Sequence, residues 1–180
     1  KLTNIKVDTK NTKYTDINGV LFNKDKTTLV QYPKGKSGSY TIPDSVTSIG
    51  DAAFEDCDGL TSVSIGNSVT SIGLYAFYDC DNLKTVYNNS SLDIVEGSTS
   101  HGYVAYYADE VIKPTDTGSC GESLTYTFYE SNGTLTITGT GDMTNWSNSS
   151  YAPWYSYCSK IKTVTIGNSV TSVGQKAFYY

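Results

Sequence analysis

The sequence contains no arginine, and histidine occurs only once among its 180 residues. Arginine binds phosphate groups through two parallel hydrogen bonds, and proteins that bind nucleic acids rely heavily on such contacts. Its absence therefore argues against a nucleic-acid partner. Catalytic and metal sites need several converging polar groups. The single histidine, His101, has only ordinary surface residues near it in the sequence: Ser100, Asp109 and Glu110.

Sequence motifs of common enzymes are also missing. There is no glycine-rich phosphate loop, no paired-cysteine metal spacing and no Gly-x-Ser-x-Gly turn. A calcium site at Gly141 and Asp142, or at the acidic corners, is disfavoured because the chain lacks a loop with ligands at alternating positions. We therefore predict no enzymatic activity, no catalytic residue, no metal and no cofactor.

Long hydrophobic runs are missing as well. No apolar stretch approaches the ~18 residues that a membrane-spanning helix needs, so we expect no direct membrane insertion by this segment. The residues that follow Lys1 have neither the charged start nor the hydrophobic core of a secretion signal.

Charge is unevenly distributed along the chain. Residues 1–36 contain eight lysines and three aspartates, a balance of +5, whereas the remaining residues contain five lysines and fifteen acidic residues, a balance of −10. The lysine-rich start is expected to be a solvated surface. The alternative is a patch that contacts an acidic surface.

Internal repetition is what the sequence has in abundance. Residues 42–64 and 65–87 are two copies of one 23-residue unit, and a third copy occupies residues 158–180. The apolar positions recur at the same spacing, while most residues between them change in size or charge. Self-similarity at a period of about 20–50 residues is typical of a solenoid, in which stacked coils bury a shared core that one coil cannot form alone.

Each unit predicts a short strand. The run Leu60-x-x-Val63-x-Ile65 has apolar residues at alternating positions toward its end, which suits a strand with one face inward. Ser62 and Ser64 would then face solvent.

A corner is predicted before this strand. Gly50 recurs at the same phase in each copy, which indicates either a positive φ or a close approach to the neighbouring coil. The segment Asp51–Cys57 is interpreted as one helical or 3-10 turn that packs Ala53 and Phe54 inward.

The repeated pattern IP-x-SV-T-SIG-x-x-AF-x-x-C-x-x-L-x-x-V, in residues 42–87 and 158–180, resembles the BspA-like leucine-rich repeats of surface proteins from host-associated bacteria and some mucosal protozoa. The resemblance implies a curved right-handed solenoid, α/β in class but mostly β. It also implies display outside the cell, and binding or adhesion rather than catalysis. We expect the secretion signal and the anchor to lie outside these residues, which would be part of a longer surface protein.

The chain is predicted to form two domains. Residues 1–113 would be a repeat array with an irregular opening coil (1–41), regular repeats (42–87) and a closing cap (88–113). Residues 114–180 would hold a β-hairpin cap and the start of a second array.

Two hairpins are predicted from alternating apolar residues around turn-forming residues. The first pairs residues 20–22 with 29–30, after a strand that contains Ile5 and Val7. The second pairs residues 124–128 with 134–139.

Residues 88–113 break the period, and Tyr103, Val104, Tyr106 and Tyr107 are expected to close the open end of the first array with aromatic area. Residues 113–118 are interpreted as a linker or a domain boundary.

Aromatic residues gather before the third copy, and packing is favoured over a stacking platform for sugar rings. These residues are Trp146, Tyr151, Trp154, Tyr155 and Tyr157.

Cysteine occurs four times. Cys57 and Cys80 lie one coil apart, about 5 Å by the spacing of stacked strands, which permits a bridge. Their side chains should point the same way into the core, so free buried thiols are favoured. Cys120 stands off the repeat phase and could pair with Cys158.

A solenoid aligns the outward positions of successive strands into one exposed sheet face. We predict partner contacts at these positions, which are small and hydroxylated apart from two lysines and one tyrosine: Thr61, Ser62, Ser64, Lys84, Thr85, Tyr87, Lys162, Thr163 and Thr165. The expected partner is a protein or glycan on a host or neighbouring cell. The alternatives are a spacer within a larger surface protein and a carbohydrate-binding module that uses the aromatic cap.

Overall fold

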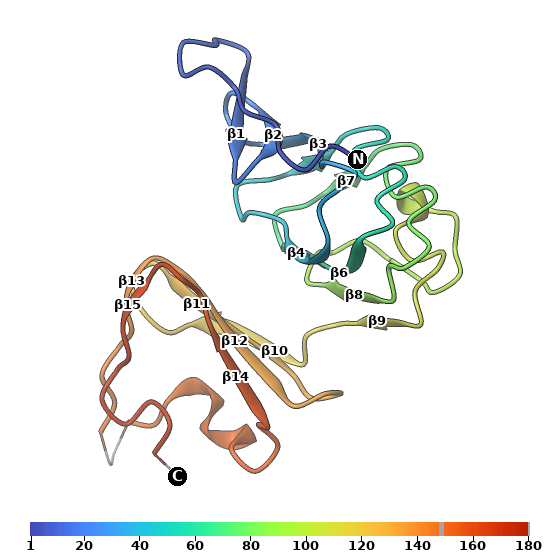
Figure 1. The fold of residues 1–180 in the computed structure, drawn as a ribbon. Helices are drawn as coiled ribbons and strands as arrows, with labels where there is room; N and C mark the ends of the chain where they lie inside the picture. Colours follow the sequence, from blue (N-terminus) through green and yellow to red (C-terminus); the bar gives the residue numbers. More distant parts are fainter. Residues whose placement is uncertain (148–149, 180) are drawn as a thin grey trace. The chain divides into compact units, whose positions relative to one another are not determined.

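The structure is a computed structural model that describes residues 1–147 and 150–179. The chain forms two compact units, Lys1–Ile112 and Lys113–Tyr180, which we call the first and the second unit. Nearly all regular structure is β, with only two short 3-10 helices, η1 (His101–Tyr103) and η2 (Pro153–Tyr157), in the described residues (Figure 1).

The first unit opens with three antiparallel strands, β1 (Tyr14–Ile17), β2 (Val20–Asn23) and β3 (Thr28–Gln31). The pairing of β2 with β3 confirms the predicted hairpin. The strand predicted at Ile5 and Val7 is wrong. There the Val7 amide donates to the Asp16 side chain (2.9 Å), so a carboxylate takes the place of a ladder partner.

The repeats that follow form a solenoid with two sheets. One sheet is parallel and contains β4 (Gly38–Thr41), β6 (Leu60–Ile65), β8 (Thr85–Asn88) and β9 (Glu110–Ile112). The other sheet extends β3 with β5 (Ser48–Ile49) and β7 (Ser71–Ile72). Val63 pairs with Val86 and Ile49 with Ile72, each 23 residues apart, which confirms the repeat length and the stacking.

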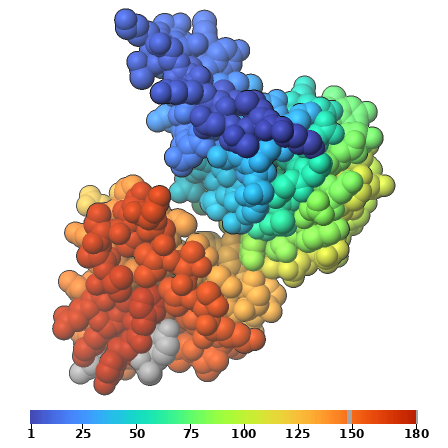
Figure 2. All heavy atoms as spheres, viewed as in Figure 1, coloured from blue at the N-terminus to red at the C-terminus, as the bar shows by residue number. Residues whose placement is uncertain are grey.

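The space between the two sheets is a continuous apolar core. Phe54 and Phe77, equivalent residues of successive coils, are fully buried and stack with ring centroids 4.5 Å apart and planes 8° from parallel. Tyr32 of the opening coil stacks on the other side of Phe54 at 4.9 Å. In Figure 2 the coils of this unit follow one another as bands from light blue through cyan to green.

The corner contains 3-10 turns, as the sequence predicts, although these turns do not join into a 3-10 helix. The Glu55 amide donates to the Ala52 carbonyl (3.1 Å), three residues earlier, and Ala53 and Phe54 are buried. Residues 51–56 form successive turns in which every second amide donates its hydrogen bond to the next coil. The Ala52 amide donates to the Leu74 carbonyl (2.9 Å), and the Phe54 amide donates to the Ala76 carbonyl (2.7 Å). Because every second donor bonds to the next coil, consecutive 3-10 hydrogen bonds cannot form.

The recurring glycine allows the backbones of neighbouring coils to approach closely. It does not adopt a left-handed conformation. Neither Gly50 nor Gly73 has a positive φ, whereas the corner residues Ala52 (φ 51°) and Tyr75 (φ 53°) do. A Cβ atom added at Gly73 would lie 2.6 Å from the backbone nitrogen of Asp51, in the preceding coil.

Replacing Gly73 with alanine is therefore expected to lower the free energy of unfolding of the first unit by about 1–3 kcal/mol, because backbone must shift to admit a methyl group. Gly66→Ala is the matched control, since its Cβ would meet no atom closer than 3.9 Å. Urea unfolding should give Gly66→Ala unchanged or higher stability, by up to about 1 kcal/mol. Equal losses in both variants would contradict close approach as the reason for the glycine.

The segment after the regular repeats continues the stack. Strand β9 pairs in parallel with β8, and Val86 lies opposite Val111, 25 residues later. This coil is therefore two residues longer than the regular 23-residue repeat, but it stacks in the same way.

The predicted aromatic closure is only partly right. Val104 and Ala105 are buried in the core, with Ile94, while Tyr103, Tyr106 and Tyr107 remain on the surface. Small aliphatic side chains therefore close this end of the core.

The second unit begins with the antiparallel strands β10 (Asp116–Ser119), β11 (Leu124–Tyr129) and β12 (Thr134–Gly139). The pairing of β11 with β12 confirms the second predicted hairpin. The second unit begins at Lys113, within the predicted linker or boundary, but residues 116–118 are not a linker because they belong to β10. The polar sequence of β10 lacks the alternating apolar residues that would predict a strand. Within it, Gly118 has no side chain and so leaves space for the ring of Tyr126.

The third repeat copy extends this hairpin. Strand β14 (Thr163–Ile166) pairs in parallel with β12, and β15 (Val170–Ser172) pairs with β13 (Gly141–Asp142). Ala177 is buried, but Val164 and Ile166 are 37 % and 43 % exposed. These two predicted core positions stay open because β14 is an edge strand in the part of the chain that the structure describes.

Candidate binding surfaces

The parallel sheet of the first unit brings six of the nine predicted contact residues onto one face. Ser62 pairs with Thr85, which pairs with Glu110, so a row of polar side chains runs across the strands. A second row passes through Ser64 and Tyr87. Of the remaining two residues, Thr61 belongs to β6 and Lys84 directly precedes β8, and the Lys84 amide donates to the carbonyl of Thr61 (3.0 Å).

Side-chain hydrogen bonds connect this face. The Thr85 hydroxyl donates to the Glu110 carboxylate (3.1 Å), and the Lys84 ammonium donates to the backbone carbonyl of Tyr107 (3.4 Å). Thr61 and Lys84 are exposed, while the other four are half-buried. The face is consequently flat, polar and weakly charged, without a catalytic constellation.

The other three predicted residues, Lys162, Thr163 and Thr165, lie on and beside β14 in the second unit and are exposed. They share a strand with the exposed Val164 and Ile166, so both faces of this strand are open.

The aromatic residues of the second unit divide between packing and a pocket. Trp154 is fully buried and donates its indole N–H to the carbonyl of Ala177 (2.9 Å). Tyr157 stacks on Phe128 at 4.8 Å. Trp146 is buried as well, at 5.3 Å from Trp154, so three of the five predicted aromatics serve the core.

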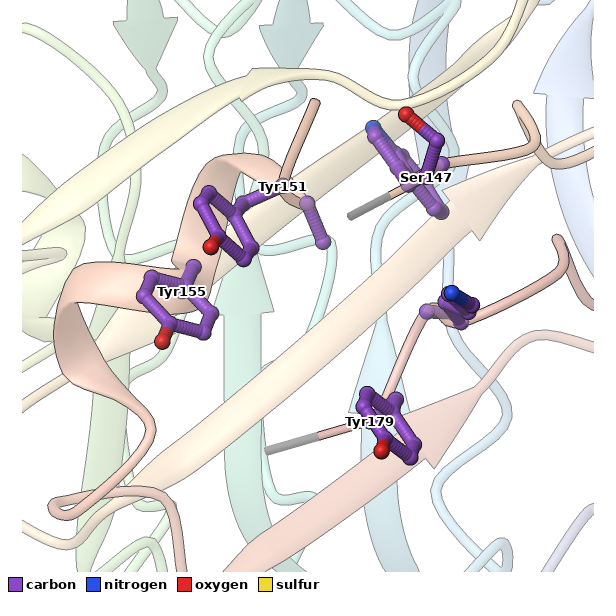
Figure 3. Close-up of a pocket in the computed structure, with 8 residues that line it drawn as sticks. Ser147, Tyr151, Tyr155 and Tyr179 are labelled. Carbon is purple, nitrogen blue, oxygen red and sulfur yellow. The ribbon is translucent and has the colours of Figure 1, made fainter. Parts of the chain in front are cut away.

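The other two, Tyr151 and Tyr155, are exposed and stack at 4.0 Å on the rim of a shallow pocket. Figure 3 shows these rings beside each other, with Ser147 and Tyr179 across the pocket. Lys176 also lines the pocket, with its ammonium 5.5 Å from the centre of the Tyr179 ring.

A cluster of surface tyrosines in the first unit escaped the sequence analysis. Tyr75 and Tyr78 come from the second regular coil, and Tyr103, Tyr106 and Tyr107 come from the segment that closes the core. A signal for the first two was present, because they replace Ala52 and Glu55 at outward positions of the repeat. The sequence predicts that the other three cover the end of the core, but the irregular segment around them does not indicate that they meet Tyr75 and Tyr78.

The family model of the BspA type leucine rich repeat region, in six copies, matches residues 31–152 and 110–180. The chain belongs to this family. No curated protein matches the sequence.

Three solved structures are similar to this BspA-type chain. A leucine-rich repeat protein from Eubacterium ventriosum is 20 % identical, with a TM-score of 0.43. The match covers 90 % of this chain and 42 % of the Eubacterium chain. A leucine rich cell surface protein from Faecalibacterium prausnitzii is 24 % identical, with a TM-score of 0.41. The match covers 95 % of this chain and 47 % of the Faecalibacterium chain. The pneumococcal vaccine antigen PcpA is 27 % identical, with a TM-score of 0.42. The match covers 48 % of this chain and 24 % of the PcpA chain. The chain therefore spans less than half the length of each.

Other candidate chemistry in the BspA-type chain has structural explanations. The Asp142 carboxylate accepts a hydrogen bond from Thr171 (2.7 Å), and bonds from Thr171 and Ser172 lower the pKa of Asp142. His101 is only half-buried, so its ring needs no buried partner, and its Nδ1 lies 3.3 Å from the Ser100 hydroxyl. In residues 1–147 and 150–179, no three His, Cys, Asp or Glu side chains gather as metal ligands would, and no helix is long and apolar enough to cross a membrane.

All four cysteines are free thiols, as favoured for Cys57 and Cys80, and the possible pairing of Cys120 with Cys158 does not occur. The Cys80 thiol donates to the carbonyl of Phe54 (3.0 Å). Burial raises the pKa of Cys57 and of Cys80 to about 12, and that of Cys120 to about 11.

We expect a disulfide-exchange reagent at pH 8 to modify the half-buried Cys158 first. The other three thiols should react at least about 100-fold more slowly, because they are buried and protonated and react only when the structure opens. In denaturant all four should titrate. Three rapidly reacting thiols in the native chain would contradict the buried environment, and fewer than four in denaturant would indicate a bridge.

Proposed function

We propose that this BspA-type chain is a non-enzymatic binding module displayed outside the cell, and that the exposed face of the β4–β6–β8–β9 sheet contacts a protein or glycan of a host or neighbouring cell. Membership of the family supports display and binding. The mostly β solenoid supports a scaffold whose inward positions are fixed by packing and whose outward positions are free to vary.

The observation that carries the proposal is the register of the sheet. Because Ser62, Thr85 and Glu110 lie side by side, neighbouring strands offer hydrogen-bonding groups about 5 Å apart, at the spacing of paired strands. Lys84 and Tyr87 provide the two larger side chains at this face. Tyrosine is enriched among the residues that dominate binding energy, so these two are the proposed anchors.

A screen of the chain against glycan and extracellular-matrix arrays would identify a partner. Replacing both Lys84 and Tyr87 with alanine is then expected to weaken binding about tenfold or more, because anchors dominate the affinity. The matched control replaces Lys6 and Tyr14, one exposed lysine and one exposed tyrosine outside the sheet face, and should leave affinity unchanged. Affinity should be measured by surface plasmon resonance.

Unchanged binding by the Lys84 and Tyr87 variant would favour the alternative of a spacer within a larger protein, or another surface of the chain. The stacked Tyr151 and Tyr155 at the pocket of the second unit support a second candidate, a carbohydrate site. Aromatic faces pack against the apolar faces of sugar rings, and these two rings are not required by the core. Glycan binding that survives the sheet-face variant but is lost in Tyr155→Ala would assign binding to that pocket.

A further inference from the structure

Five tyrosines form a connected patch on the surface of the first unit, which we call the tyrosine patch: Tyr75, Tyr78, Tyr103, Tyr106 and Tyr107. Neighbouring ring centroids are 4.8–5.7 Å apart. Tyr75 and Tyr103 stack within 20° of parallel, and Tyr78 stands at 83° and 88° to them. The patch therefore presents both faces and edges of phenol rings to solvent.

The core does not require these rings. Tyr75 is 53 % exposed, and Tyr78 and Tyr106 are exposed as well. Val104 and Ala105 close the core in their place. One coil earlier, Ala52 and Glu55 occupy the positions of Tyr75 and Tyr78 with the same backbone path, so the repeat folds without aromatics there.

The patch is held in place before any partner arrives. Gly102 has a φ of 64°, and a Cβ atom on it would lie 2.4 Å from the carbonyl oxygen of Gly73. The Phe77 amide donates to the carbonyl of Gly102 (2.7 Å). These contacts fix the closing segment against the last regular coil and set Tyr103 over Tyr75, so that binding would cost little ordering entropy.

Carboxylates border the patch. The Asp79 charge is the main cause that raises the pKa of Tyr78. Burial followed by the charges of Asp81 and Asp79 raises the pKa of Tyr107. Residues 42–112 contain a single lysine, Lys84, against eleven acidic residues. The field around the patch is therefore negative.

In the preceding coil the equivalent acidic corner is occupied by ammonium groups. There the Lys34 ammonium lies 2.6 Å from Asp56 and 3.5 Å from Glu55, and Lys1 pairs with Asp58. Those lysines come from the opening coil of the same chain.

The equivalent residues 23 positions later are Tyr78, Asp79 and Asp81. Among the described residues, no lysine makes an ion pair with Asp79 or Asp81. The same acidic corner is thus filled by ammonium groups in one coil, and in the next it lacks them and has gained aromatic rings.

We propose that the tyrosine patch, with Asp79 and Asp81, is a docking surface for a lysine- or arginine-rich segment of a partner polypeptide. Cationic side chains lie favourably over the faces of tyrosine rings, and the two carboxylates supply the opposite charge. This surface adjoins the proposed sheet face at Lys84, whose ammonium donates to the carbonyl of Tyr107, but it is made by other side chains and its occupant is defined by positive charge.

The test uses the 180-residue chain and a fluorescently labelled ten-residue oligolysine peptide, with binding followed by anisotropy. Binding is expected at about 20 mM salt and should weaken strongly at about 500 mM, because screening shortens the range of the carboxylate field. Tyr75→Ala with Tyr78→Ala should weaken it about tenfold, through loss of the ring faces. Alanine is tolerated at this corner, since Ala52 has the same left-handed backbone.

Two further variants separate the patch from general acidity. Asp79→Asn with Asp81→Asn should weaken binding about fivefold at low salt. Asp25→Asn with Asp44→Asn removes the same charge from exposed positions outside both the patch and the sheet face, and should change affinity less than about twofold. Tyr75→Phe with Tyr78→Phe keeps the rings and should retain binding. Melting temperatures of all variants confirm folding.

Equal losses in the two acidic double variants, or unchanged binding in the tyrosine-to-alanine variant, would overturn the proposal. So would a glycan array on which neutral sugars bind in a patch-dependent manner while oligolysine does not. Tyr87→Ala alone keeps Lys84, which contacts Tyr107 of the patch. This variant should weaken sheet-face binding and leave oligolysine affinity unchanged, so failure of one proposal is distinguishable from failure of the other.

Discussion

Replacement of Phe54 by alanine is expected to lower the free energy of unfolding of the first unit by about 3–5 kcal/mol. Its ring is fully buried between Tyr32 and Phe77, with centroids at 4.9 and 4.5 Å. Because the ring links the opening coil to the regular repeats, its removal leaves a cavity that neither neighbour can fill without leaving its own coil. Hydrogen exchange of the amides of β6 and β8 in increasing urea would measure the loss.

Leu74→Ala is the control for this substitution. Leu74 belongs to the coil of Phe77, but its side chain is 73 % exposed. Its truncation should change stability by no more than about 0.5 kcal/mol. A loss below about 1 kcal/mol for Phe54→Ala would mean that the stacked rings do not form the interior that unites the coils.

Trp154→Ala should destabilise the second unit by about 3–5 kcal/mol. The indole is fully buried, lies 5.4 Å from Tyr126 and 5.7 Å from Phe178, and donates its N–H to the carbonyl of Ala177. It therefore connects the hairpin to the third repeat copy. The only other tryptophan, Trp146, lies in the same unit, so its fluorescence reports unfolding of this unit in urea.

Trp154→Phe separates packing from the hydrogen bond. It keeps most of the ring but leaves the Ala177 carbonyl without its indole donor, and an unsatisfied buried group costs about 1–3 kcal/mol. Tyr179→Ala, at an exposed ring of the same unit, should be nearly neutral. If Trp154→Ala were as mild as Tyr179→Ala, the second unit would not depend on this core.

The two proposed surfaces illustrate how a repeat separates stability from recognition. Inward positions such as Phe54 and Phe77 keep the same residue because each must pack against its equivalent in the neighbouring coil. The outward position beside them is Ala52, Tyr75 and Lys176 in the three copies. The backbone is left-handed at all three, with φ of 51°, 53° and 58°, so the corner holds its shape whatever side chain it presents.

The amino-acid sequence by itself determined the regular part of this protein. The 23-residue spacing placed Val63 beside Val86, and alternating apolar residues located the two hairpins. These features follow from local periodicity, since equivalent residues at a fixed interval can bury a common core only by stacking.

Tertiary structure alone decided what lies where the period is irregular. Strand β10 is polar in sequence and is a strand because β11 pairs with it. Tyr103 is half-buried, whereas the next two residues of the same irregular segment, Val104 and Ala105, enter the core. Packing space and pairing partners are supplied by distant parts of the chain, so no local pattern records that the tyrosines meet Asp79 and Asp81 on one surface.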